Sequence, residues 1–483
     1  MAAEDNFIVA IELGSSNVVG LVGRKQPDGA IQILAHAQEP ASSFIRKGRI
    51  FNVEKMKQCI SNMKQNLEKD LNKYINQVYV GIGGMGMHSV MHNISRSFSD
   101  KVIISQEIID EMKDTNFNTS SAYKEILDVI PQEYKLGTQY QTDPVGIFAD
   151  NIEGCFLNIV ANPNMCEQVD NCFRSAGISI ADKPITIINL ADSILTESEK
   201  RTGCVFVDMG AETTTVAIYK NNILRHFAVI PLGGANVTRD ITNFIIDEEE
   251  AENLKQQYGV AYTESYTKQA PIQLKDGRTI DHEEFTELVE ARLEEIILNI
   301  ANQIKLSKIE TEKLIGGIIL TGGSANMKDI EKAVSKYTDF EKVRVVKSLR
   351  LSLRSNISDF NKDGSYNAAL SLIEHGDINC CGGNLGSSSN TLFPTVEEIK
   401  AQQEAEERAR REREEQERIK AEEEKRQQEE MEAEKEAQRI KEEQDRERKK
   451  KFWNPFKSMI NKMTSLVNEE GENTDSSEQT HNN

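Results

Sequence analysis

The chain contains one segment twice, and this internal repeat restricts the fold more than any other feature of the sequence. Residues 9–22 read VAIELGSSNVVGLV and residues 205–218 read VFVDMGAETTTVAI, which aligns them without a gap at an offset of 205 − 9 = 196 residues. In each copy a β-rich run ends in an acid-x-Gly turn with hydroxyl side chains and returns as a second β-rich run. The repeat predicts two halves of the same topology, each opening with such a hairpin.

The turn of each hairpin is suited to holding a phosphate group. Gly14 and Gly210 permit a tight turn, and neighbouring backbone N–H groups then face inward as an anion-binding nest to which hydroxyl groups add donors. The acidic residues, Glu12 and Asp208, are suited to holding Mg²⁺ through water. One such turn alone is usually an ordinary turn. Two in register predict a pair of loops that clamp a triphosphate from both sides.

A third glycine-rich element lies at residues 316–327, which read GGIILTGGSANM. This sequence indicates a buried strand that opens into the start of a helix. Gly322 and Gly323 would let a flat base lie against the backbone, as a nucleoside site requires. Taken alone, the element is equally compatible with a plain strand-to-helix turn.

The remainder of the chain up to about residue 375 alternates short β-rich runs with amphipathic helical stretches. Clear β-rich runs occur at 7–11, 77–82, 204–207 and 316–320. This pattern predicts an α/β fold in which helices cover the sheets.

Composition excludes several classes of function. The formal net charge is −20, which argues against a nucleic-acid partner because such proteins need a basic surface. The seven cysteines form no CxxC pair, and the seven histidines show no ligand pattern, so no thiol metal site or disulfide is expected. The chain lacks an apolar run of membrane-spanning length and begins without a basic, apolar leader, so we expect a cytoplasmic protein.

The composition changes after about residue 376. Residues 377–395 are predicted to be a flexible linker, and residues 396–451 a charged spacer. Within 401–450 there are 19 acidic and 15 basic residues and no Pro, Gly or aromatic residue, so this stretch buries no core. Frequent acid-to-base pairs four residues apart favour a solvated helix of ~75 Å at 1.5 Å per residue. A coiled coil and disorder are the alternatives.

Residues 452–468 predict an amphipathic helix, followed by a polar tail at 469–483. Five lysines accompany its apolar face, three of them at 449–451 just before the helix, and Pro455 is tolerated only in the first turn. Such a helix suits the headgroup layer of an anionic membrane, where each lysine contributes ~1 kcal/mol; docking on the core or on a partner is the alternative. The predicted membrane-facing residues are Phe452, Trp453, Phe456, Met459, Ile460, Met463, Leu466 and Val467.

The three glycine-rich motifs together resemble those of the superfamily of actin, heat-shock chaperones and sugar kinases, whose members bind ATP between two duplicated ribonuclease-H-like domains. More narrowly, the chain resembles the bacterial FtsA family over about residues 7–375. The segment Val129-Ile-Pro-Gln-Glu-Tyr134 discriminates most, because it lies in a subdomain that other actin-like proteins lack. Further matches are Ile11-Glu-Leu-Gly-Ser15, Asp143-Pro-Val-Gly146, Leu190–Glu199, Pro231–Ile241, Leu320–Gly323 and Ser365–Leu372.

The resemblance implies four subdomains within the actin-like fold. They are a first core domain at 7–84 plus 164–200, a family-specific insertion at 85–163, a second core domain at 201–232 plus 305–376, and a partner-binding subdomain at 233–304.

It also implies ATP and Mg²⁺ as cofactors and assigns the residues that bind them. The metal would be held through water by Glu12 and Asp208. The first phosphate loop corresponds to Glu12, Gly14, Ser15, Ser16 and Asn17, and the second to Asp208, Gly210, Thr213 and Thr214. The adenosine motif corresponds to Gly322, Gly323 and Ser324. Glu252 and Lys255, on a predicted helix at 248–258, match positions that contact ribose and base.

Two departures from the superfamily pattern bear on activity. Asn17 stands where many members carry a cation, and Ala211-Glu212 replaces a Gly-Gly pair. Both changes make the site less positive and weaken stabilisation of a transferring phosphoryl group. We therefore expect a nucleotide switch that hydrolyses ATP slowly or not at all, and no catalytic residue is assigned.

The family resemblance implies a role in cell division on the cytoplasmic side of the inner membrane, at the septum. The chain would polymerise as an actin-like protofilament, bind anionic lipids and other division proteins, and grip the C-terminal peptide of the tubulin-like protein FtsZ, with Arg292 at the peptide site. The alternatives are an actin-like scaffold of cell shape or pilus assembly, and an ATP-dependent enzyme such as a sugar kinase or chaperone.

Overall fold

The computed structural model of this chain describes residues 6–119, 125–265, 269–355 and 363–384. All of them lie in the first of the two units into which the chain divides, residues 1–387. The predicted spacer, amphipathic helix and polar tail, from residue 396 onward, lie outside the described residues. No helix in the described ranges is long and apolar enough to cross a membrane.

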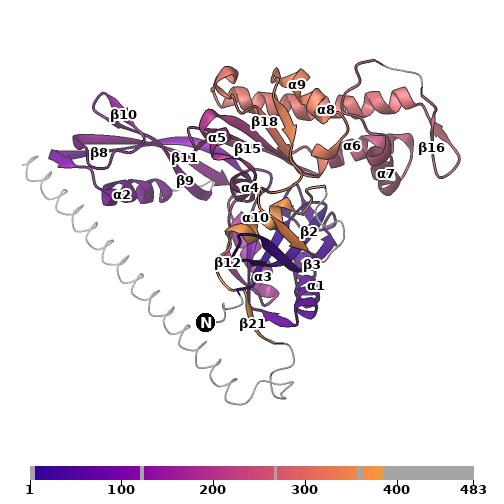
Figure 1. Cartoon of the computed structure of the whole chain (residues 1–483), viewed down its shortest axis with the longest axis horizontal. Coiled ribbons are helices and arrows are strands. Elements are labelled where there is room, and N and C mark those ends of the chain that lie inside the picture. Colours follow the sequence, from indigo (N-terminus) through magenta and orange to yellow (C-terminus); the bar gives the residue numbers. More distant parts are fainter. Residues whose placement is uncertain (1–5, 120–124, 266–268, 356–362, 385–483) are drawn as a thin grey trace, which may run out of the picture. The chain divides into compact units, whose positions relative to one another are not determined.

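The first lobe is built on a six-stranded sheet of order β12-β7-β1-β2-β3-β20 (Figure 1). Strands β1, β2 and β3 form an antiparallel meander, and β7 pairs in parallel with β1. The strands are β1 Ile8–Leu13, β2 Asn17–Lys25, β3 Ile31–Pro40, β7 Gln77–Gly81, β12 Ser179–Asp182 and β20 Leu353–Ser355. Four helices pack around this sheet, namely α1 Val53–Leu71, α3 Met165–Ser175, α4 Thr186–Ile194 and α10 Asn367–His375.

The second lobe repeats this topology in the same register. Its strands β15-β14-β13-β18-β19 form one half of a nine-stranded sheet. Glu12 pairs with Val19 across the first hairpin, and Asp208 pairs with Thr215 across the second, which preserves the offset of the sequence repeat. The predicted duplication is therefore confirmed. The elements are β13 Cys204–Met209, β14 Thr214–Lys220, β15 Ile223–Ile230, β18 Ile318–Thr321, β19 Val343–Val345, α5 Glu197–Thr202, η2 Thr311–Lys313, η3 Gly323–Asn326 and α9 Ile330–Thr338.

The insertion extends the second lobe's sheet instead of forming a detached domain (Figure 1). Its first strand lies beside β15, where His88 pairs with Ala228. The motif at 129–134 lies on β9 at this joint, because Gln132 Nε2 donates to Leu224 O at 2.9 Å and Gln132 Oε1 accepts from Arg225. The inserted elements are β8 His88–Ile103, α2 Gln106–Phe117, β9 Glu125–Leu136, β10 Gln139–Gln141 and β11 Phe148–Ala161, which enclose a small core of their own.

The segment 233–304 shares one hydrophobic core with the second lobe. Phe285, Leu293 and Ile297 of its long helix are buried in the same cluster as Val205 and Ile218 of the sheet. Asp247 and Asp281 cap the N-termini of the two longer helices by accepting backbone N–H bonds. The elements are α6 Gly234–Ile241, η1 Thr242–Phe244, α7 Glu248–Tyr258, β16 Ile272–Gln273, β17 Thr279–Ile280 and α8 His282–Leu306, and α7 covers the predicted helix at 248–258.

The chain after β19 returns to the first lobe, which differs from the predicted extent of the second core domain at 305–376. Strand β20 pairs in parallel with β3, and α10 packs on β1, β2 and β7. Leu370, Leu372 and Ile373 are fully buried in the core of the first lobe. The apolar face of α10 therefore assigns this stretch to the first lobe.

The start of the predicted linker is also ordered structure. Residues Cys381–Asn384 form β21, which pairs with β6 (Lys73–Ile75). Tyr79 Oη accepts the backbone N–H groups of Asp377 and Ile378 and donates to the Asp377 carboxylate. The prediction of a flexible linker is wrong for 377–384, because these hydrogen bonds and buried Cys380 fix a segment whose composition alone suggested freedom.

Candidate functional site

A cavity of about 1560 Å³ is lined by the turns of both repeated hairpins, the β18–η3 connection, α6, α7 and the segment at 363–368. Ligand pockets usually measure about 300–1,000 Å³, so a nucleotide has ample room here. Of the fourteen residues predicted to bind nucleotide, all except Thr214 line this cavity. Thr214 is fully buried, and its hydroxyl donates to Leu232 O at 2.9 Å, so it faces the protein interior.

The two glycines occupy equivalent positions in the two turns. A Cβ atom placed on Gly14 would lie 2.5 Å from Asn17 O, and one placed on Gly210 would lie 3.0 Å from Thr213 O. Asn17 and Thr213 are themselves related by the repeat. Each turn thus folds its own backbone carbonyl over the glycine, which leaves no room for a side chain at Gly14 and little at Gly210.

Two carboxyl groups lie at the ends of β1 and β13, in the wall of the cavity. Burial and the negative charge of Asp208 raise the pKa of Glu12 to about 8, although Gly14 N–H opposes this shift. Burial raises the pKa of Asp208 to about 6. Both side chains keep some contact with the solvent of the cavity. No lysine or arginine contributes to either pKa shift. A bound cation would therefore stabilise the charged form of both carboxyl groups.

These two carboxylates are compatible with Mg²⁺ but do not form a complete metal site. Within the described residues, no group of three or more His, Cys, Asp or Glu side chains is arranged to hold a metal ion. Mg²⁺ commonly uses one or two carboxylates and fills its other positions with water and substrate phosphate oxygens. The residues present fit that mode of binding.

The second turn carries Glu212, and its charge is paired. Glu212 Oε1 accepts from Arg239 of α6 at 3.2 Å, and Glu212 Oε2 accepts from the backbone N–H of Lys47 at 2.6 Å. Lys47 belongs to the first lobe. The sequence-based expectation that Glu212 simply adds negative charge to the phosphate site therefore needs correction, because this carboxylate already has two donors.

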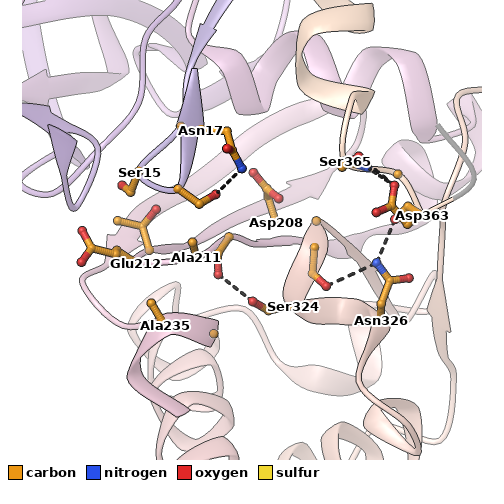
Figure 2. A pocket seen from close by; sticks show the side chains of 18 of the residues that line it. Ser15, Asn17, Asp208, Ala211, Glu212, Ala235, Ser324, Asn326, Asp363 and Ser365 are labelled. Atoms are coloured by element: carbon orange, nitrogen blue, oxygen red, sulfur yellow. Dashed lines mark hydrogen bonds between the residues drawn. The ribbon is translucent and has the colours of Figure 1, made fainter. Parts of the chain in front are cut away.

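The glycine-rich motif after β18 contacts the second turn directly. A Cβ atom on Gly322, which has φ of 90°, would collide with Asp208 Oδ1 and with the backbone of Met209. Ser324 Oγ donates to Gly210 O at 2.8 Å (Figure 2). Gly323 is different, because nothing lies within 4 Å of an added Cβ there. The motif thus packs on the strand end that carries Asp208 and leaves Gly323 open to the cavity.

Glu252 and Lys255 are part of a connected cluster and not a simple surface pair. Lys255 is only 12 % exposed, and its ammonium group donates to Glu252 at 2.6 Å and to Thr238 Oγ1 at 2.9 Å. Burial acts to raise the pKa of Glu252, but hydrogen bonds from Lys255 and Thr238 outweigh it and lower the pKa. The cluster fixes one Lys and one Glu at the cavity wall.

Several lining residues were not assigned from the sequence. Asp363 and Ser365 lie at the opposite end of the cavity from Ser15 and Glu212 (Figure 2), and Asn326 Nδ2 donates to Asp363 O at 2.8 Å. The first turn of α6 also packs on the second hairpin turn, since Ala235 N–H donates to Ala211 O at 2.7 Å. Ser365 and the first turn of α6 belong to motifs that resemble the family, whereas Asp363 lies just before one. The motifs carried no indication of these contacts.

Arg292 lies outside the cavity, on α8. Its guanidinium group donates from Nε and Nη2 to both carboxylate oxygens of Asp240, at 2.5 and 3.1 Å, and from Nη1 to Glu295. The hydrogen bonds with Asp240 raise the pKa of Arg292. The predicted peptide-binding arginine is thus occupied by two carboxylates of its own subdomain.

Two family models match the chain. The model described as cell division protein FtsA matches residues 205–371, and the model of the SHS2 domain inserted in FtsA matches residues 84–160. Cell division protein FtsA of Porphyromonas gingivalis is 28% identical over 347 residues, which cover 70% of this chain and 72% of that protein. FtsA of Escherichia coli K12 is 25% identical over 391 residues, which cover 78% and 91%.

A solved structure supports the fold independently of sequence. A chain of the PilM–PilN type IV pilus biogenesis complex aligns with a TM-score of 0.53 and 14% identity, over 76% of this chain and 97% of that one. At this identity the likeness concerns the fold alone, and it agrees with the predicted actin-like arrangement. Duplicated lobes, the matched insertion and these relatives lead to one assignment: the chain belongs to the FtsA family of cell-division proteins.

Proposed function

We propose that this protein binds ATP with Mg²⁺ between its lobes and acts as a filament-forming adaptor that tethers FtsZ to the inner face of the cytoplasmic membrane at the septum. The observation that carries the nucleotide part is the convergence of thirteen predicted residues from four parts of the fold on one cavity. The tethering part rests on membership of the FtsA family and on the amphipathic sequence at 452–468.

In this proposal the hairpin turns hold the phosphates from both sides. The hydroxyl groups of Ser15, Ser16 and Thr213 and the backbone N–H groups of the turns would donate to phosphate oxygens. Asp208 and Glu12 would hold Mg²⁺ through water, and the ion would neutralise phosphate charge. Asn17 supplies no positive charge, and Arg239 is engaged by Glu212. Stabilisation of a transferring phosphoryl group is therefore weak, which favours slow hydrolysis or none.

Titration calorimetry with ATP, in buffer containing either Mg²⁺ or EDTA, tests the nucleotide site. We expect binding with Mg²⁺ and at least about tenfold weaker binding in EDTA or with Asp208→Asn. Thr215→Ser is the matched control, since Thr215 is the direct cross-strand partner of Asp208 and the substitution keeps its hydroxyl group. Absence of ATP binding by the wild type would reject the proposal, and equal binding with and without Mg²⁺ would reject its metal part.

The FtsZ peptide would compete with Asp240 for Arg292. Peptide carboxylates suit a guanidinium group, and Asp240 presents a carboxylate to it already. Asp240→Asn should therefore tighten binding of the FtsZ C-terminal peptide, whereas Arg292→Glu should weaken it by about tenfold or more. Fluorescence anisotropy with a labelled peptide measures both. If neither variant changes the affinity, Arg292 is not part of the peptide site.

Membrane attachment is tested by sedimentation of the full chain with anionic vesicles, with and without ATP and the FtsZ peptide. Trp453→Glu combined with Phe456→Glu places two charges on the predicted apolar face and should abolish sedimentation. Ser458→Glu with Asn461→Glu places the same charges on the predicted polar face and should reduce it far less. Equal losses in both double variants would show that charge alone, and not the apolar face, accounts for the binding.

A further inference from the structure

A two-residue turn lies at the point where both lobes and the insertion meet. Lys47 and Gly48 connect the short strands β4 (Ile45–Arg46) and β5 (Arg49–Ile50) of the first lobe. Both residues have positive φ, 51° and 72°, as a tight hairpin turn of this length requires. The turn exposes backbone N–H and C=O groups on its outer side, where they are free to bond to other parts of the chain.

Three parts of the fold contact these backbone groups. Lys47 N–H donates to Glu212 Oε2 in the second hairpin turn at 2.6 Å, and Gly48 N–H donates to Ser15 Oγ in the first at 2.8 Å. Met85 N–H, at the root of the insertion, donates to Lys47 O at 2.8 Å. A two-residue turn thus links both candidate phosphate loops to the segment that leads into β8.

Of these three contacts, only the one made by Glu212 joins the turn to the second lobe, and it is made by a side chain. Arg239 holds its other carboxylate oxygen, so the side chain is fixed from both ends and is only 17 % exposed. Where the superfamily pattern has a Gly-Gly pair in this loop, no side chain could reach the opposite lobe. The replacement therefore gives this chain a contact across the cavity that the pattern lacks.

We infer that Glu212 is a positioning residue that latches the two phosphate loops together through the Lys47–Gly48 turn and thereby fixes the root of the insertion. Its role in nucleotide binding rests on the proposed function. With the latch closed, the two lobes stay in the arrangement described here without help from a ligand. A nucleotide then leaves slowly, and the insertion keeps its orientation relative to both lobes.

Space around Gly48 supports a tight coupling between the turn and the insertion. A Cβ atom on Gly48 would lie 2.5 Å from Gly84 Cα, and one on Gly84 would lie 2.6 Å from Gly48 O. The two backbones are therefore in direct contact. A movement of the turn must displace the segment at 83–87, because no flexible side chain lies between them to absorb it.

Hydrogen–deuterium exchange of the full chain without nucleotide tests the latch. Glu212→Ala removes the acceptor for Lys47 N–H, so exchange should rise about tenfold or more in peptides covering 45–50 and 83–88. Glu212→Gln keeps one acceptor oxygen, which can meet Lys47 N–H when the amide NH2 faces Arg239, so its rise should be clearly smaller than that of Glu212→Ala. Lys47→Ala is the matched control, because the donor is the backbone and the side chain is dispensable. Exchange in peptides of α8 reports whether any variant is globally destabilised.

Release of a fluorescent ATP analogue provides the second measurement. The latch predicts release at least about five times faster from Glu212→Ala than from the wild type, with Glu212→Gln in between or unchanged. Unchanged exchange at 45–50 and 83–88 in Glu212→Ala, or an equal rise in Glu212→Gln, overturns the inference. If the exchange result holds but the wild type binds no analogue, the latch stands and the proposed nucleotide function fails.

Discussion

The two hairpin turns at the cavity share a framework but differ at their tips. The first turn presents Ser15, Ser16 and Asn17, whereas the second presents Ala211, Glu212 and Thr213. Strand register, the position of an acidic residue and the position of the glycine are the same in both. The first tip carries hydroxyl and amide groups that line the cavity, while the second directs a carboxylate to the opposite lobe.

The framework of the two hairpins comes from the duplication, whereas the residues at the tips are specific to each copy. The common framework places a glycine turn and a carboxyl group on each side of the cavity, which makes a symmetric clamp. The two tips differ in what they are suited to do. The first can donate hydrogen bonds to a ligand, and the second holds the two lobes together through Glu212. The carboxyl groups also differ, because the pKa of about 8 leaves Glu12 largely neutral at pH 7 and the pKa of about 6 leaves Asp208 largely charged.

Alanine substitutions of the two glycines should separate the two loops most clearly. Gly14→Ala would place Cβ 2.5 Å from a backbone oxygen, so the first turn must open. Gly210→Ala meets the equivalent oxygen at 3.0 Å, which a small shift accommodates. We expect ATP affinity to fall by about a hundredfold or more in Gly14→Ala and by about threefold in Gly210→Ala, measured by calorimetry. Equal losses would contradict the described geometry of the turns.

Amide substitutions of the two acids should stabilise the empty protein by different amounts. The folded state raises the pKa of Glu12 from 4.5 to about 8 and that of Asp208 from 3.8 to about 6. The folded state therefore binds each proton more tightly than the unfolded state, and the wild type loses stability as the pH rises through these ranges. At pH 8 we expect Glu12→Gln to gain on the order of 4 kcal/mol and Asp208→Asn on the order of 3 kcal/mol.

Urea denaturation in EDTA, at pH 4 and pH 8, measures this effect. Near pH 4 both carboxyl groups are largely protonated in the folded state, and Glu12 is largely protonated in the unfolded state as well, whereas Asp208 is only about half protonated there. The stability advantage of the amide should therefore almost vanish for Glu12→Gln and become small for Asp208→Asn. An advantage of Glu12→Gln that is the same at both pH values would show that it arises from packing and not from ionisation. A larger gain for Asp208→Asn than for Glu12→Gln would reverse the assigned order of the two pKa values.

Much of the clamp could be predicted from the sequence because its determinants are local. The acid-x-Gly turns, the flanking apolar runs and the fixed offset between the copies are each readable within a short window, and the strand register reproduces them. The actin-like fold followed from these motifs together with the glycine-rich segment at 316–327, and the FtsA assignment from the segment at 129–134 and the further matches. The exception is Thr214, whose hydroxyl turns into the core because alternate residues of β14 face opposite sides.

The remaining features depend on partners that are distant in the sequence. Glu212 and Lys47 are 165 residues apart, and nothing in either local sequence indicates that they meet. The placement of α10 on the first sheet and the pairing of β21 with β6 likewise depend on which apolar surface is left uncovered by the rest of the chain. Arg292 illustrates the same limit, because Asp240 lies 52 residues away and its orientation is set by α6.

Adding a cation to the first turn tests the proposal that Asn17 limits the attraction of this turn for phosphate. The Asn17 side chain lines the cavity and makes a long hydrogen bond of 3.4 Å to Ser16 Oγ. Asn17→Lys should raise ATP affinity by about tenfold, because a charge-assisted hydrogen bond to phosphate contributes about 1.5 kcal/mol or more. Asn17→Gln, which adds length without charge, is the control. The gain should shrink at high salt, and a salt-independent gain would point to packing instead.

Valine substitutions of the two adjacent threonines give the smallest expected effects but separate ligand binding from folding within a single turn. Thr213 lines the cavity, so Thr213→Val should weaken ATP binding about threefold by removing one hydroxyl donor, with little change in stability. Thr214→Val leaves Leu232 O without its buried donor and should cost about 1 kcal/mol of stability, with ATP affinity unchanged. Calorimetry and urea denaturation on both variants measure the two effects. If Thr214→Val weakens ATP binding as much as Thr213→Val does, the second turn responds to the ligand as one rigid unit, and the division between a ligand-facing residue and a core-facing residue does not hold.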